Sequence, residues 1–106
     1  MIDFYVTKSP AETVNLIKDA VMSGSLTGAL IDEYTNDGVT VLVFDKHYYR
    51  AGNRLTLTVV IDTCFGKTHI HAVGGGGGEG LFRFDWGASD SFEDCIRNAL
   101  RMYEIQ

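Results

Sequence analysis

The sequence predicts an α+β domain in which a single antiparallel sheet of five to six strands carries two helices on one face. Three features predict this class. Residues 55–62 alternate apolar and polar side chains, the pattern of a strand with one buried face. Residues 9–24 and 90–103 space their apolar side chains like amphipathic helices. Short turns separate the remaining segments, so neighbouring strands pair as hairpins and both helices bury their stripes on one face of the sheet.

Length and composition indicate one globular domain, residues 1–106. A chain of 106 residues buries about two-thirds of its unfolded surface and folds around a single core. Its content of 45% hydrophobic and 22% charged residues is ordinary for a globular protein. The expected order is a strand, a helix, four strands, a short additional strand and a final helix.

The first strand and the first helix have clear signals in the sequence. Residues 2–7 are apolar and partly β-branched, as in a strand. Ser9 is a helix cap, Pro10 suits the first helical position, and Glu12 completes a capping box. Gly24 ends the helix. The apolar stripe comprises Val14, Ile17 and Val21, widened by Leu16 and Ala20.

Four strands are expected in the middle of the chain. They are residues 28–34, 39–48, 55–62 and 68–73. Asn36-Asp37-Gly38 predicts a tight turn between the first two, because Asp and Gly accept the backbone geometry of such turns. The side chains of the third that we expect to face the helices are Leu55, Leu57, Val59 and Ile61.

Five consecutive glycines, residues 74–78, follow the last of these strands. Such a run disfavours regular structure, so we expect a loop over Gly74–Gly80. Residues 81–86 then predict a short sixth strand, so the glycines do not lead directly into a helix as a phosphate-binding loop does. Asp90 caps the last helix. Its apolar stripe comprises Phe92, Cys95, Ile96, Ala99, Leu100 and Tyr103.

The sequence contains few candidate catalytic or metal-binding residues. His69 and His71 share one face of a strand, where His47 or Cys64 would be the third ligand of a metal site. No local spacing supplies the remaining ligands, so we expect two solvent-facing histidines, no metal and no cofactor. Neither Cys64 nor Cys95 has an adjacent basic residue to activate it, and no nucleophile motif is present. No catalytic residue is predicted.

Charge and hydropathy argue against several classes of protein. The net charge is −5, and the nine Lys and Arg residues are scattered along the chain. A nucleic-acid-binding protein usually carries a basic stripe, so we expect neither nucleic acid nor an anionic membrane as a partner. The N-terminus lacks the pattern of a signal peptide, and no apolar run approaches the roughly 20 residues of a membrane span. A cytoplasmic protein with reduced thiols is expected.

Residues 39–48 carry apolar side chains on both faces of the predicted strand. One set contains Val39, Val41 and Val43, and the other contains Leu42 and Phe44. If the first set faces the core, Leu42 and Phe44 are exposed on the open face of the sheet, near Val60. Such a patch predicts a homodimer or another interface. Scattered exposed hydrophobic residues, or a face covered by a loop of the same chain, are the alternatives.

Two resemblances add to these expectations. The segment from the glycine run through Leu81-Phe82-Arg83-Phe84-Asp85-Trp86-Gly87-Ala88 resembles a family of short bacterial proteins known only as a domain of unknown function. That resemblance spans most of the chain and implies no activity. The element order is also similar to a reduced helix-grip fold, whose members commonly hold apolar ligands between the sheet and the C-terminal helix. No binding residues of that fold match positions in this sequence.

Two functions follow from these features. The first is a non-enzymatic cytoplasmic domain that self-associates through the open face of its sheet, using Leu42, Phe44 and Val60. The second is a module that binds a small apolar ligand between the sheet and the last helix. In that case the loop over Gly74–Gly80 gates the pocket. Its expected ligand-binding residues are Phe82, Phe84, Trp86, Tyr103, Gly76 and Gly77.

Overall fold

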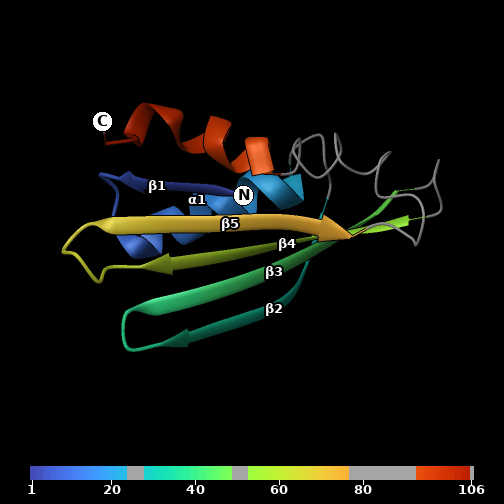
Figure 1. Ribbon diagram of the computed structural model, residues 1–106, viewed down its shortest axis with the longest axis horizontal. Helices are drawn as coiled ribbons and strands as arrows, with labels where there is room; N and C mark the ends of the chain where they lie inside the picture. Colours follow the sequence, from blue (N-terminus) through green and yellow to red (C-terminus); the bar gives the residue numbers. More distant parts are fainter. Residues whose placement is uncertain (24–27, 49–52, 77–92, 106) are drawn as a thin grey trace.

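A computed structural model of the protein describes residues 1–23, 28–48, 53–76 and 93–105. The elements are β1 (Ile2–Val6), α1 (Pro10–Ser23), β2 (Ala29–Asn36), β3 (Val39–Tyr48), β4 (Asn53–Asp62), β5 (Thr68–Gly76), a helix over residues 93–100 and η1 (Arg101–Tyr103). The strands form one sheet in the order β1-β5-β4-β3-β2, with every neighbouring pair antiparallel (Figure 1).

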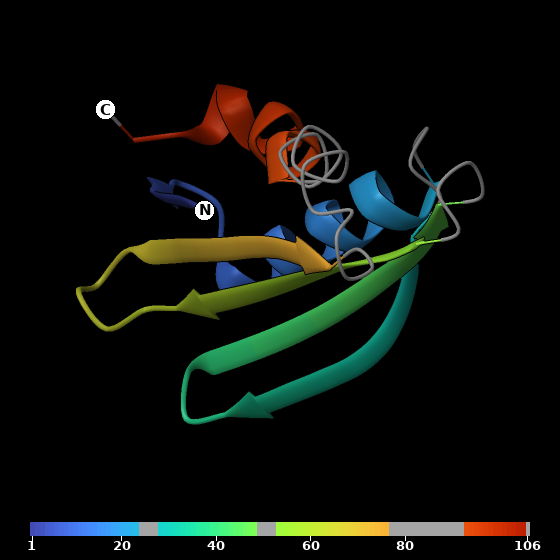
Figure 2. The same ribbon diagram turned by 45° about the vertical axis from the view of Figure 1, so that its right-hand side comes forward.

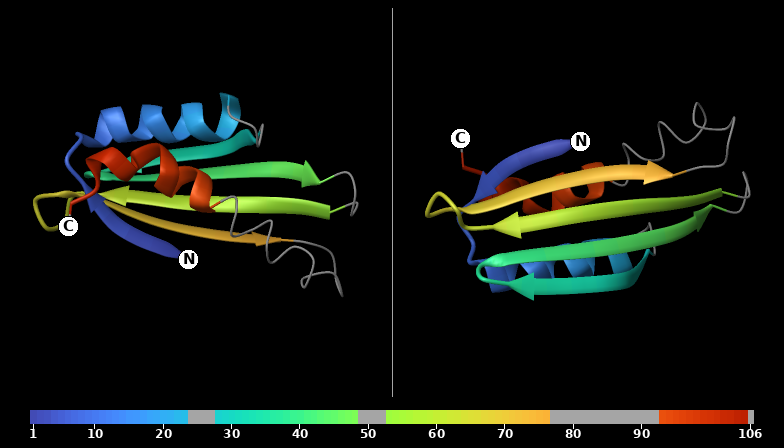
Figure 3. Two further views of the ribbon diagram at one scale, coloured as in Figure 1. Left: turned by 90° about the horizontal axis from the view of Figure 1, so that it is seen from above. Right: turned by 60° about the horizontal axis from the view of Figure 1, so that its bottom comes forward.

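Both helices lie on the same face of this sheet (Figure 2). α1 contacts β2 and β4, and the helix over residues 93–100 buries Ile96 and Leu100 in the same core. The opposite face of the sheet carries no element of the described part of the chain (Figure 3). The predicted α+β class and order of elements are therefore confirmed, and we call this second surface the open face.

α1 begins with the predicted capping box. The Ser9 hydroxyl accepts a hydrogen bond from the Glu12 amide at 3.2 Å and donates one to the Glu12 carboxylate at 3.0 Å. Ile17 and Val21 are buried as predicted. Thr13 is the third buried residue of the helix, whereas Val14 is only partly buried against the core.

The hairpin of β2 and β3 turns at Asp37 and Gly38, the predicted position. Both residues have positive φ angles, 47° and 80°. This geometry is typical of two-residue turns that match the twist of the flanking strands. Further along β2, the pairing register shifts between Leu30 and Asp32, which leaves Ile31 in an irregular position.

The core face of β4 is the predicted one, but that of β3 is the reverse of our expectation. Leu42 and Phe44 are 0% exposed, so their predicted exposure on the open face is wrong. Leu42 pairs with Val59 and Phe44 pairs with Leu57, and directly paired residues share a face of the sheet. Because Val59 and Leu57 face the helices, Leu42 and Phe44 do too, and the alternate valines of β3 lie on the open face.

β5 continues into the glycine run, beyond the predicted end at residue 73. Gly74 pairs with Leu57 and Gly76 pairs with Leu55, so the backbone of β4 holds these glycines in the ladder. The amide of Gly74 also donates a 2.7 Å hydrogen bond to the buried carboxylate of Glu93, whose other oxygen contacts the Met1 amino group at 2.7 Å. This contact ties the last helix to the sheet.

Several predicted features lie outside the described residues. They are the end of the first helix at Gly24, the Gly77–Gly80 part of the glycine loop, the sixth strand over residues 81–86, the helix cap at Asp90 and Phe92 of the last apolar stripe.

The C-terminal residues pair with the edge of the sheet, which the sequence did not predict. The final helix ends at residue 100 and continues as η1, rather than running to residue 103 as an α-helix. The Thr7 amide donates to the Tyr103 carbonyl at 2.9 Å, and the Ile105 amide donates to the Tyr5 carbonyl at 2.8 Å. These bonds satisfy the Tyr5 carbonyl of β1 and the Thr7 amide just after it, on the side away from β5.

None of the helices in the described ranges is long and apolar enough to cross a membrane.

Candidate functional site

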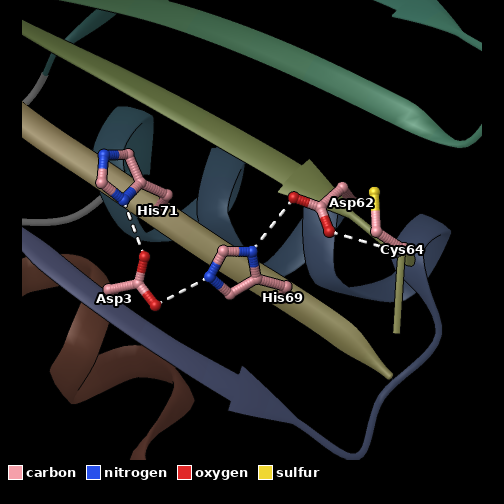
Figure 4. Close-up of polar contacts among 5 residues, drawn as sticks. All are labelled: Asp3, Asp62, Cys64, His69 and His71. Atoms are coloured by element: carbon pink, nitrogen blue, oxygen red, sulfur yellow. Dashed lines mark hydrogen bonds and ion pairs between the residues drawn. The ribbon is translucent and has the colours of Figure 1, made fainter. Parts of the chain in front are cut away.

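Two histidines and two aspartates meet on the open face, at the end of the sheet formed by β1, β5 and β4. Asp3 pairs with His71, and His69 pairs with Asp62, so the strand register brings all four side chains to one surface (Figure 4). We call His71, Asp3, His69 and Asp62 the histidine–aspartate network. Its members come from three strands, and they connect residues as far apart in sequence as 3 and 71.

The network alternates imidazoles with carboxylates. His71 Nδ1 lies 2.7 Å from Asp3 Oδ2, and the other oxygen of Asp3 lies 2.7 Å from His69 Nε2. His69 Nδ1 lies 3.0 Å from Asp62 Oδ2. The second oxygen of Asp62 accepts a hydrogen bond from the Cys64 amide at 3.2 Å. Tyr5 completes the surroundings, with its ring centroid 4.7 Å from that of His69.

Both ring nitrogens of His69 face a carboxylate oxygen. A neutral imidazole carries only one N–H, so it donates to one carboxylate and turns a lone pair toward the other. The imidazolium form donates to both. The geometry around His69 therefore fits the protonated side chain, held between Asp3 and Asp62.

The pKa shifts of the network agree with this geometry. Burial alone lowers the pKa of His69, but its hydrogen bonds to the Asp62 and Asp3 carboxylates outweigh this effect and raise that pKa above its usual value. The hydrogen bonds of His71 and His69 lower the pKa of Asp3. For Asp62, burial raises the pKa, but the hydrogen bonds of His69 and Cys64 prevail and lower it.

An apolar patch lies beside the network at the centre of the open face. Its members, which we call the valine patch, are Val39, Val41, Val43 and Val60. All four are only partly buried, although the helices on the other face exclude water from the alternate residues of the same strands. Tyr34 and Val73 extend the patch toward β2 and β5, with 56% and 43% of their surface exposed.

Charged residues border the valine patch at the other end of the strands. Asp45 accepts two hydrogen bonds from the Arg54 guanidinium, from Nε at 2.9 Å and from Nη2 at 2.5 Å. Asp32 pairs with Val43 at the β2 side and is exposed. The open face thus has an apolar centre with polar groups around it.

The structure separates the residues predicted for the interface. Val60 lies on the open face, paired with Val41, but Leu42 and Phe44 lie in the core. The apolar surface of the open face therefore combines Val60 with Val39, Val41 and Val43. Leu42 and Phe44 do not contribute to it.

Most residues predicted to bind an apolar ligand lie outside the described ranges, namely Phe82, Phe84, Trp86 and Gly77. Gly76 is the last residue of β5. Tyr103 is partly buried against the core, and the Lys8 ammonium lies 4.7 Å from the centroid of its ring. The ligand site stays a prediction.

A groove of about 390 Å³ runs between α1 and the hairpin of β2 and β3. Two pairs of its polar side chains already contact each other. Lys18 and Glu33 form an ion pair at 2.7 Å, and the hydroxyls of Thr35 and Thr40 lie 3.1 Å apart. A ligand entering the groove would compete with these contacts, so the open face is the stronger candidate for function.

Metal binding and thiol chemistry find little support among the described residues. Within residues 1–23, 28–48, 53–76 and 93–105, no group of three or more His, Cys, Asp or Glu is arranged to hold a metal ion. Cys64 is exposed and Cys95 is partly buried, and both are free thiols. Cys95 Sγ donates to the Ala20 carbonyl at 3.3 Å, and burial raises the pKa of its thiol, which disfavours the reactive thiolate.

Asp3 and Asp62 are the residues of the network that the sequence analysis missed. The alternation of Ile2, Phe4 and Val6 with Asp3 and Tyr5 predicts which face Asp3 occupies. It does not predict that β1 pairs with β5, a strand more than 60 residues later. The contact with both histidines follows from that pairing.

These features define a two-layer α+β domain with one uncovered sheet face that combines an apolar patch and a histidine–aspartate network. The chain belongs to a family of unknown function, DUF6054, whose pattern it matches over residues 1–104. No curated protein and no solved structure matches it significantly, so the resemblance to a helix-grip fold stays an expectation.

Proposed function

We propose that this chain is an interaction domain that forms a homodimer through the open face of its sheet. The valine patch is the observation that carries this proposal. It is contiguous across the central strands, and no element of the described part of the chain covers it. Monomeric proteins rarely leave such a surface in water. An apolar centre with a polar border is also the usual anatomy of a protein interface.

A second copy of the chain fits this face because an apolar pair sits on the line between β3 and β4. Val41 and Val60 are direct partners across that line. A two-fold axis parallel to the strands would stack Val60 of one copy on Val41 of the other, twice per dimer. The result would be a sandwich of two sheets about 10 Å apart with the helices on the outside.

Charge favours this axis over one that runs across the strands. An axis across the strands, centred on Val41 and Val60, would bring Asp3 of one copy against Asp3 of the other. The axis parallel to the strands stacks β5 on β2, so Asp3, His69 and His71 of the two copies lie at opposite sides of the interface, and only Asp62 lies beside the axis. Like charges in contact across an interface cost several kcal/mol. We therefore propose the arrangement in which the two Asp3 residues are apart.

The test is the mass in solution of three proteins, measured by sedimentation velocity. We expect the wild type to be a dimer and Val41→Asp to be a monomer, because the new carboxylate would be buried without a partner. Met22→Asp is the control, since Met22 is 44% exposed on α1 and gains the same charge away from the open face. Circular dichroism establishes that each variant is folded. A monomeric wild type would overturn the proposal.

Binding of an apolar ligand between the sheet and the last helix is the second function that the sequence predicts. Native mass spectrometry beside the denatured mass tests it, because a bound ligand adds its mass to the native protein alone.

A further inference from the structure

We infer that dimerisation through the open face takes up protons at the histidine–aspartate network, so that the dimer tightens as the pH falls toward 6. This inference rests on the homodimer proposed above. It extends that proposal by naming the group of side chains that controls the assembly.

The first step is the hydrogen bonding of the network. Asp3 contacts both histidines, and His69 lies between two carboxylates at 2.7 and 3.0 Å. Only the imidazolium form of His69 donates to both. The folded chain therefore already has a site shaped for a bound proton, and its ligands are fixed by three strands of one sheet.

The second step is the charge of the network. The two carboxylates carry a charge of −2, and the imidazolium form of His69 between them offsets one of these charges. Imidazole is the side chain that changes charge between about pH 5 and pH 8. Protonation of His69 as the pH falls therefore makes the network less anionic.

The third step is burial. The His71 side chain is 39% exposed in the single chain, and β5 lies over β2 of the partner in the proposed dimer, so assembly would remove water from it. Burying two carboxylates costs less when an imidazolium between them offsets part of their charge. The dimer therefore favours the protonated network, and proton binding favours the dimer by the same amount.

The other charged groups described near the network do not reverse this coupling between proton binding and dimerisation. On β1 the neighbours of His69 are Asp3 and Tyr5, on β4 the neighbour is Asp62, and from the following turn Cys64 contributes only its amide. His71 pairs across β4 with the apolar Val60. Elsewhere on the face, the exposed Asp32 adds negative charge that also favours protonation, and Asp45 is paired with Arg54.

The experiment measures the dimer dissociation constant of the full chain by sedimentation equilibrium at pH 8, 7 and 6. We expect the constant to fall about tenfold or more from pH 8 to pH 6 for the wild type, since each subunit binds at least part of a proton on assembly. His69→Gln, which stays neutral at every pH, should lose most of this dependence. His47→Gln is the matched control, because it removes the third histidine of the chain and leaves all four residues of the network unchanged.

Each outcome decides a separate point. Absence of a dimer at every pH would overturn the proposed function. A dimer with a constant Kd from pH 8 to pH 6 would leave that function standing and overturn the inference. Loss of the dependence in His47→Gln, with His69→Gln unchanged, would also overturn it. Calorimetry of wild-type dissociation in buffers of different ionisation enthalpy counts the protons directly, so the test does not depend on the folding of a variant.

Discussion

At the scale of single residues, His69 determines the chemistry of the open face. Each of its ring nitrogens contacts a carboxylate oxygen. His69 lies on β5, and its two contacts connect this strand to Asp3 of β1 and to Asp62 of β4. The partly exposed ion pairs of the network add little to stability individually, but together they tie the edge strand to the centre of the sheet. Because one imidazole supports both links, its protonation state affects three strands at once.

The network predicts how the free energy of unfolding depends on pH. The folded state raises the pKa of His69 above 6.5, so its stabilisation is complete below pH 6.5 and is lost as the pH rises through the raised value. The lowered pKa values of Asp3 and Asp62 give stabilisation above pH 3.8 that is lost as the pH falls through them. Urea denaturation should therefore show a maximum between about pH 4 and pH 6.5.

His69→Gln is the variant that checks this dependence. It should lower the maximum and flatten the decline between pH 6 and pH 8, because the titrating group is gone. A wild-type unfolding free energy that rises steadily from pH 5 to pH 8 would contradict the assignment. Both proteins are measured at concentrations at which they are monomeric, so that assembly does not contribute to the free energy of unfolding.

At the scale of elements, the sequence predicted the features that depend on neighbouring residues. The capping box of α1, the turn at Asp37-Gly38 and the alternation of β4 all follow from side chains within a few positions of one another. The sequence did not predict which face of β3 is buried, because β3 is apolar on both sides. Its pairing with β4, which follows residues 49–52, decides which side chains face the helices. The same holds for Asp3 and for the C-terminal bridge between Val6 and Glu104, which both depend on distant partners.

The faces assigned to the residues of β3 predict unequal losses of unfolding free energy for two adjacent substitutions. Leu42→Ala should reduce the free energy of unfolding by about 2–5 kcal/mol, because it leaves a cavity under the helices. Val41→Ala should reduce it by about 1 kcal/mol or less, since Val41 is partly exposed in the monomer. Chemical denaturation of dilute samples measures both. Equal costs, or a larger cost for Val41→Ala, would contradict the assigned faces.

At the scale of the whole molecule, the arrangement concentrates its apolar side chains on two surfaces of one sheet. The helices cover the first, and the proposed partner covers the second. The net charge of −5 opposes assembly, so the position of each acidic group relative to the two-fold axis matters. The axis parallel to the strands keeps Asp3 and both network histidines of the two copies apart and stacks the β5 side of one copy on the β2 side of the other.

This geometry predicts a specific cross-link. Asp32 and Val73 lie in the same row across the sheet, joined through Val43 and Thr58. In the proposed dimer, Asp32 of one copy therefore lies over Val73 of the other. Stacked sheets are about 10 Å apart, which exceeds the reach of a disulfide, so a bis-maleimide linker of that length is required.

The experiment compares a mixture with its separate components in a Cys64→Ser background, which removes the exposed native thiol. Asp32→Cys mixed with Val73→Cys should give covalent dimers. Each variant alone should give few, because β2 and β5 are three strand spacings apart and each lies far from its own copy in the partner. Efficient cross-linking of Tyr34→Cys with itself, at the position paired with Val41, would instead indicate an axis across the strands. That axis would press the acidic networks together and make assembly depend on their protonation even more strongly.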